Sequence, residues 1–106
     1  MPKYLLEGHY TAAGAKGLAH EGGTGRRSAI AKMVEGLGGK LDALYYAFGG
    51  VDVYGVVDMP DNVSAAAVAL AVNQSDGVSV KTVVLMTPEE MDKAGKKTVI
   101  YRPPGG

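Results

Sequence analysis

Residues 41–58 read LDALYYAFGGVDVYGVVD and contain two strand-like runs on either side of a Gly-Gly pair. Leu41–Phe48 is rich in aromatic side chains and Val51–Asp58 in β-branched ones, and both kinds are typical of strands. Gly49-Gly50 indicates a hairpin, because tight hairpin turns often need a positive φ angle. The stretch therefore predicts two antiparallel strands joined by a tight turn.

Toward the N-terminus, the sequence predicts one more strand and a helical crossover. Lys3–Tyr10 is compatible with a strand, although Gly8 weakens it. Thr11–His20 is Ala-rich but contains two glycines, which predicts a short or frayed helix. Thr24 can cap a stronger helix, whose apolar residues at i, i+3, i+4 and i+7 are Ile30, Met33, Val34 and Leu37.

Toward the C-terminus, the sequence predicts a helix, a strand and a short final helix. Val63–Asn73 is Ala-rich and follows capping side chains, and Val78–Met86 is the clearest strand in the chain. Thr87-Pro88-Glu89-Glu90 combines a capping threonine, a proline at the first helical position and a reciprocal glutamate. The order is βαββαβ, an α+β fold of ferredoxin-like type with an antiparallel sheet and an added C-terminal helix.

The chain divides into one domain, residues 1–95, and a tail, residues 96–106. The tail is basic and ends in Pro-Pro-Gly-Gly, which favours a mobile segment. The alternative is that Thr98–Tyr101 forms an extra strand that pairs with the sheet edge of another subunit.

Composition limits the classes of function. Eleven basic and eleven acidic residues give a net charge of zero, without the cationic bias that nucleic-acid binding needs. The chain has no cysteine, and its longest apolar run, Ala65–Val72, is too short to span a membrane. With only His9 and His20 as histidines, no metal spacing is present, and nothing indicates a cofactor. We therefore expect a cytoplasmic protein that binds neither nucleic acid nor membranes and forms homo-oligomers.

Strand alternation assigns each residue of the predicted sheet to one of two faces. The face covered by helices would carry mostly apolar residues: Leu41, Ala43, Tyr45, Ala47, Val51, Val53, Val57, Val78, Val80, Val84 and Met86. The opposite face would be mixed: Glu7, His9, Asp42, Leu44, Tyr46, Phe48, Asp52, Tyr54, Val56, Ser79, Lys81, Val83 and Leu85. Because this face is half apolar and no helix covers it, we expect it to pack on another sheet or to surround a ligand.

The polar side chains of this second face are the candidates for chemistry. A face-to-face dimer would enclose them in a lower dielectric, where pKa values shift enough for proton transfer. His9 and Asp52 are then candidate catalytic bases, and Tyr54 or Tyr46 would position a substrate. The alternative is that Asp42, Asp52 and Lys81 form structural ion pairs across neighbouring strands.

Residues 22–27, Gly-Gly-Thr-Gly-Arg-Arg, are a candidate anion site. Free amides at a helix N-terminus, together with the guanidinium groups of Arg26 and Arg27, can hold a phosphate or carboxylate. The segment lacks both the Walker ending and the Rossmann glycine spacing, and the alternative is a solvated helix entrance. The candidate ligand-binding residues are Arg26, Arg27, Tyr46 and Lys81.

Several segments carry a family resemblance. They are residues 1–8, 10–12, 14–18, 22–27, 37–41, 48–54 and 61–67. Together they resemble the GYD-domain family of small bacterial proteins over roughly residues 1–92. Gly50-Val51-Asp52 stands where the family has its Gly-Tyr-Asp triplet. The resemblance implies a ferredoxin-like fold of the dimeric α/β-barrel type, and it implies no reaction.

Three functions fit these features. The leading hypothesis is an oligomeric protein that binds a small anionic or aromatic metabolite between the uncovered sheet face and the loop at residues 22–27. The first alternative is a cofactor-independent lyase, isomerase or oxygenase that uses His9 or Asp52 as its base. The second alternative is a structural protein that assembles into a ring or filament.

Overall fold

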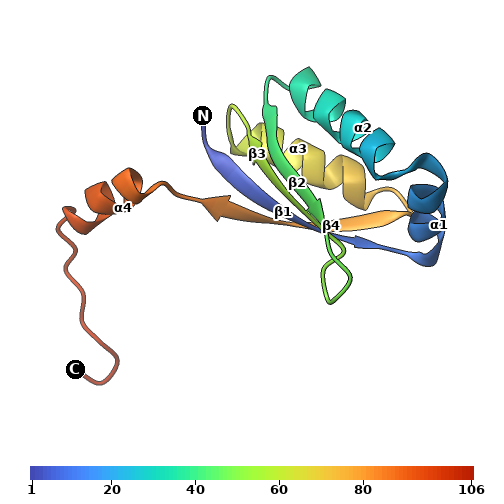
Figure 1. Ribbon diagram of the computed structural model, residues 1–106. Coiled ribbons are helices and arrows are strands. Elements are labelled where there is room, and N and C mark those ends of the chain that lie inside the picture. The colour runs from blue at the N-terminus through green and yellow to red at the C-terminus, as the bar shows by residue number, and fades with distance from the viewer.

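The computed structural model describes all 106 residues as a four-stranded sheet, three helices packed on or beside it, and a fourth helix that stands apart (Figure 1). The elements in chain order are β1 (Lys3–Tyr10), α1 (Ala12–Glu21), α2 (Gly23–Gly36), β2 (Lys40–Tyr46), β3 (Val53–Asp58), α3 (Asn62–Asn73), β4 (Val78–Leu85) and α4 (Pro88–Gly95).

The sheet has the strand order β2-β3-β1-β4, and all neighbouring strands are antiparallel. The helices α2 and α3 lie on one face of it, and the other face is bare (Figure 1). The predicted α+β, ferredoxin-like order with an antiparallel sheet is thereby confirmed. None of the helices is both long and apolar enough to cross a bilayer.

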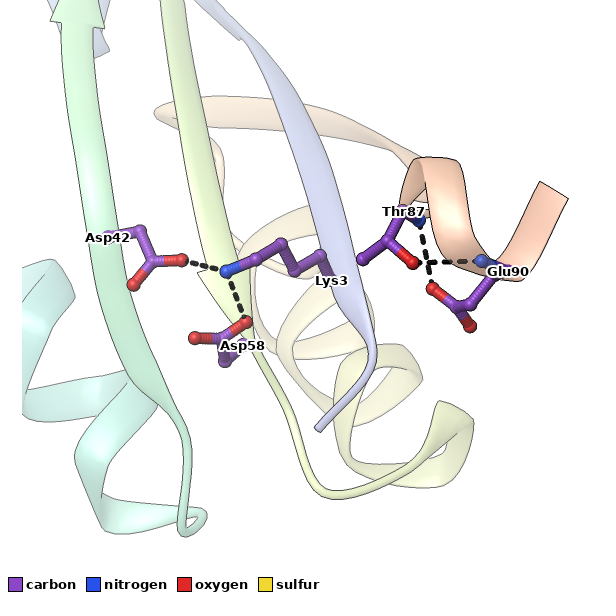
Figure 2. Close-up of polar contacts among 5 residues, drawn as sticks. All are labelled: Lys3, Asp42, Asp58, Thr87 and Glu90. Carbon is purple, nitrogen blue, oxygen red and sulfur yellow. Dashed lines mark hydrogen bonds and ion pairs between the residues drawn. The ribbon is translucent and has the colours of Figure 1, made fainter. Parts of the chain in front are cut away.

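Local capping explains where the helices begin. Thr11 accepts a hydrogen bond from the Gly14 amide at 3.1 Å, which starts α1 as a regular helix despite its glycines. Gly22, with φ of 88°, separates α1 from α2 and is the N-cap of α2 in place of the predicted Thr24. The capping box predicted for α4 is present, with Thr87 and Glu90 exchanging hydrogen bonds of 3.1 and 2.9 Å (Figure 2).

The connection between β2 and β3 is longer than the predicted tight turn. Both strands stop short of Gly49-Gly50, and neither glycine has a positive φ angle. The Ala47 amide donates to the Asp52 carbonyl at 2.8 Å and closes the loop. Asp52 is held by β1, because its amide donates to the Gly8 carbonyl at 2.9 Å. Ala47 with Asp52 continues the register of Tyr46 with Val53, so the predicted antiparallel hairpin is confirmed and Gly49-Gly50 lies at the centre of its loop.

A bulge in β2 reverses the predicted faces of its second half. Leu41 lies opposite Val57, but Ala43 lies opposite Val56, so β2 contains one extra residue at Asp42. From there on, the side chains that were expected on the open face, Leu44 and Tyr46, are on the helix side. Ala43 and Tyr45, expected in the core, are on the open face instead. Alternation cannot anticipate this change, because one added residue inverts the parity of all that follow.

The core lies between the sheet and the two helices that cover it. Its buried cluster consists of Tyr4, Val34, Val57, Met59, Ala65 and Val68. Val53 and Val57 are buried as predicted, whereas Val84 and Met86 are 62% and 50% exposed because β4 extends beyond the helices. We correct both to surface residues.

The segment after β4 projects away from the rest of the chain (Figure 1). No residue of α4 is buried, and residues 96–106 are exposed throughout and form no strand. The radius of gyration is 16.9 Å, compared with about 13 Å for a compact domain of this length. Residues 88–106 therefore contribute no buried side chain to the core.

Candidate functional site

A cavity of about 60 Å³ lies between the sheet and the helices. It forms because α2 packs over β2 and α3 over β4, while these helices make few contacts with each other. Below the gap, the two central strands carry glycines, Gly8 in β1 and Gly55 in β3, so no side chain rises from the sheet there. The other lining residues are Leu6, Tyr10, Arg26, Ile30, Met33, Leu41, Leu44, Val53, Val68, Val72, Val78 and Val80.

Arg26 is the only charged residue that lines this apolar cavity. Its side chain comes from the first turns of α2 and is 34% exposed. Its closest carboxylate is that of Glu21, with 3.9 Å between the nitrogen and the oxygen, which is a weak ion pair. The guanidinium is therefore partly desolvated and has most of its hydrogen-bonding capacity free for a ligand.

Two phenols surround Arg26. Burial raises the pKa of the Tyr10 hydroxyl, and the nearby Tyr46 adds to the shift, while the positive charge of Arg26 opposes it. Burial also raises the pKa of Tyr46, again against the charge of Arg26. Both phenols therefore stay neutral at physiological pH, and the Tyr10 hydroxyl can donate a hydrogen bond to a ligand.

The position of Tyr46 depends on Gly23, the first residue of α2. The Tyr46 hydroxyl donates to the Gly23 carbonyl at 3.0 Å. A Cβ atom at Gly23 would lie 3.2 Å from Cε2 of the Tyr46 ring. The absence of a side chain at Gly23 thus lets the ring lie against the start of the helix.

A second hollow, of about 250 Å³, lies next to the first under α1. It is lined by Tyr10, Ala15, Leu18, Tyr46, Ala47 and Asp52. Tyr10 lines both spaces, so they meet at its ring. Chemically, the site offers an apolar recess, a cation and one neutral donor, the Tyr10 hydroxyl, a combination suited to an organic anion.

The structure divides the predicted site residues between the two sides of the sheet. Arg26, Tyr46 and Asp52 gather around Tyr10 on the side of the helices. Tyr54 of β3 and Lys81 of β4 both lie opposite Glu7 of β1. Along each strand these residues alternate with residues that line the cavity, so they lie on the open face of the sheet.

His9 follows Gly8 and is on the open face as well. Arg27 is exposed on α2 and lines neither hollow. The expected site between the open face and residues 22–27 is therefore not formed, because the sheet lies between them. His9 and Tyr54 are likewise separated from Asp52, whose carboxylate accepts the Tyr10 amide at 2.8 Å.

The open face carries an ion cluster near the other end of the sheet. Lys3 of β1 contacts Asp42 of β2 and Asp58 of β3, the latter at 2.8 Å (Figure 2). Hydrogen bonds to both carboxylates raise the pKa of Lys3, and the bond from Lys3 lowers the pKa of Asp42. Of the structural ion pairs predicted for this face, Asp42 forms one with Lys3, whereas Asp52 and Lys81 form none.

The sequence reasoning missed Tyr10, Gly8 and Gly55. A signal was present, since an isolated glycine within a strand indicates a close approach of another group or an open space. Gly55 lies between Val53 and Val57 on the side of β3 that faces the helices, and Gly8 lies in the neighbouring strand β1. Two such glycines on adjacent strands predict a recess on the helix side. No group of three His, Cys, Asp or Glu side chains lies close enough to hold a metal ion.

The chain was compared with known proteins. A family model described as "GYD domain" matches residues 4–94, from the second residue of β1 to the last but one residue of α4. No curated protein and no solved structure matches the chain.

Proposed function

This chain belongs to the GYD-domain family, and we propose that it binds a small organic anion on the helix side of its sheet. The apolar part of the ligand occupies the recess above Gly8 and Gly55. Its carboxylate or phosphate accepts hydrogen bonds from Arg26 and from the phenol of Tyr10. As the chain has no cysteine and needs no disulfide, we place this binding in the cytoplasm.

One observation carries the proposal: a guanidinium without a close counter-ion at the end of an apolar cavity. Partly buried cations are usually paired, since desolvation penalises an isolated charge. The closest carboxylate to Arg26 is 3.9 Å away, so an anionic ligand would supply the missing partner. Charge-assisted hydrogen bonds of this kind contribute about 1.5–3 kcal/mol each.

The size of the site limits the ligand. Binding pockets for drug-sized molecules have about 300–1,000 Å³. The cavity of about 60 Å³ and the adjoining hollow of about 250 Å³ reach only the lower end of that range together. A single aromatic ring or a short aliphatic chain with one anionic group fits these dimensions.

We prefer binding to catalysis because of where the candidate bases lie. The Asp52 carboxylate already accepts the Tyr10 amide, and His9 is on the opposite face of the sheet. Asp52 does line the second hollow, but a backbone amide already holds its carboxylate, whereas a lyase, isomerase or oxygenase would need a free base that faces the ligand.

Titration by heteronuclear NMR tests this function, with benzoate, 4-hydroxybenzoate, butyrate and phenyl phosphate as probes. We expect at least one probe to shift the amide signals of Gly8 and Gly55. Arg26→Gln should weaken that binding at least about tenfold, as the loss of one charge-assisted hydrogen bond predicts.

The adjacent Arg27→Gln is the matched control, because it removes the same charge from an exposed position outside the cavity. Its affinity should stay within about twofold of the wild-type value, as expected for an exposed charge outside the site. The proposal is overturned if no probe shifts the two glycine signals, or if both substitutions weaken binding equally.

A further inference from the structure

The outer edge of β4 carries backbone groups without a strand partner. The Asn73 side chain accepts from the Val80 amide at 2.7 Å and donates to its carbonyl at 3.3 Å, so the backbone of Val80 points away from β1. In an antiparallel strand, alternate residues point the same way. The amides and carbonyls of Thr82 and Val84 therefore also point to the free edge.

The two edges of the sheet differ in how they are protected. The β2 edge contains the bulge at Asp42, a common means of preventing further pairing. The β4 edge pairs with β1 in an unbroken register of eight residues, and its outer half is apolar and exposed. Asn73 occupies this edge at Val80 only, so the open part begins at Thr82.

The segment after α4, residues 96–106, is called the C-terminal arm below. Thr98–Tyr101 consists of β-branched and aromatic residues, which favour strands. Val99, Ile100 and Tyr101 are 76%, 101% and 71% exposed and pack against nothing in their own chain. The arm is thus a strand-forming segment that lacks a partner, and it extends away from the sheet (Figure 1).

Charge favours a second copy of the same chain as the partner. The arm carries three basic residues and no acidic one, whereas residues 1–95 carry eight basic and eleven acidic ones. In particular, α4 begins three residues beyond the end of β4 and contains Glu89, Glu90 and Asp92 against a single lysine, Lys93. A strand added along the outer half of β4 would place the basic arm close to this acidic helix.

We propose that two copies exchange their arms, with Thr98–Tyr101 of one copy adding a strand to the β4 edge of the other at Thr82 and Val84. The exchange is reciprocal, since each chain carries both the arm and the edge, and it closes as a two-fold dimer. It would pair the four free backbone groups of Thr82 and Val84 and cover Ile100. This inference is independent of the proposed ligand site, which lies on the helix side.

Analytical ultracentrifugation of the full chain and its variants tests the exchange. We expect the wild type to sediment as a dimer. Val84→Pro removes an amide that β1 does not use, and proline is tolerated at such edge positions. Ile100→Asp places a charge in the arm, where it cannot disturb the domain because the arm makes no contacts there. Each should weaken association at least about tenfold, the effect of losing one edge hydrogen bond or one buried apolar side chain.

Two matched controls accompany these variants. Val84→Thr keeps the amide and the β-branched shape, and Leu70→Asp adds the same charge at an exposed apolar residue of α3. Both should remain dimeric. A monomeric wild type overturns the proposal, and so does a dimer that Val84→Pro and Ile100→Asp leave unchanged or that the controls weaken equally.

Cross-linking distinguishes exchange from an arm that folds back on its own edge. The chain has no cysteine, so Val83→Cys and Ile100→Cys can be introduced in separate, isotopically distinguished copies and joined by a short bismaleimide. Exchange predicts a mixed 83–100 product between copies. A doubly substituted chain that cross-links only within itself contradicts it.

Discussion

The layer between sheet and helices is filled at one end and hollow at the other. At the filled end, Tyr4 and Met59 are 2% and 0% exposed, and the Tyr4 hydroxyl bonds to Asn62. At the hollow end, Gly8 and Gly55 take strand positions that face the helices and both line the cavity, although the Val53 side chain reaches over Gly8. The same pair of strands therefore supplies stability at one end and a recess at the other, and the difference is only the size of the side chains that face the helices.

The largest loss of stability is expected from a substitution at the filled end. Met59→Ala should lower the free energy of unfolding by about 2–5 kcal/mol, since it removes a fully buried side chain and leaves a cavity. Val72→Ala, at the hollow end, should cost clearly less, because Val72 is only partly buried and already borders a cavity. Urea unfolding of the two variants measures the difference, and equal losses would contradict the contrast between the two ends.

A matched pair of glycine substitutions sharpens the contrast. A Cβ at Gly39 would lie 2.4 Å from the Asp58 carbonyl oxygen and 2.9 Å from Val34. At Gly55, the closest atom is the flexible Cδ1 of Leu44 at 3.3 Å. We expect Gly39→Ala to destabilise by about 1–3 kcal/mol through overpacking, and Gly55→Ala to change stability by less than about 1 kcal/mol.

Thermal unfolding of both alanine variants gives the comparison. Gly55→Ala should also weaken binding of any ligand that occupies the recess, whereas the folding of this variant stays intact. A Gly55→Ala protein as unstable as Gly39→Ala would mean that the recess is as tightly packed as the other end.

The smallest effect on stability is expected from the Lys3 cluster, which consists of Lys3, Asp42 and Asp58 on the open face below the filled end. The pKa of Lys3 is raised above its ordinary value of 10.5, so its contribution to stability is complete below that pH and is lost as the pH rises through the higher folded value. The pKa of Asp42 is lowered from 3.8, so its contribution is complete above pH 3.8 and is lost as the pH falls through the lower folded value.

The wild type should therefore exceed Lys3→Met in stability by a constant amount between those limits, and the gap should close at both extremes. The gap itself should be small because the cluster is exposed and screened. Denaturant unfolding of both proteins from pH 3 to pH 11 checks this, with Lys32→Met on the exposed side of α2 as the control. A gap that widens at either extreme would contradict the direction of both pKa shifts.

Much of the fold was predictable because it depends on local signals. The capping box at Thr87 and the apolar spacing of α2 each specify an element without reference to distant residues. The βαββαβ order of elements along the chain followed from the alternation of strand-like and helical patterns. The glycine pair at residues 49–50 indicated the hairpin correctly but not the length of its loop, where the Asp52 amide bonds to β1, a distant contact that local turn preference does not contain.

The site was predicted only in its parts. Arg26, Tyr46 and Asp52 were identified, but they were grouped with His9, Tyr54 and Lys81, which lie across the sheet. The error has one physical origin for Tyr46, the bulge at Asp42. For Arg26, no sequence pattern reveals which sheet face the first turns of a helix approach, so its neighbour Arg27 looked equivalent.

The extra residue at Asp42 also determines where the length of this chain can change. Deletion of Asp42 would remove the bulge and leave Ala43, Leu44 and Tyr46 opposite their present partners in β3, so Leu44 and Tyr46 would stay in the helix layer. A deletion at residues 48–51 would merely shorten an exposed loop. Insertions and deletions among related chains should therefore collect in that loop and at Asp42, and avoid residues 43–46, where the loss of one residue would move Tyr46 to the other face of the sheet.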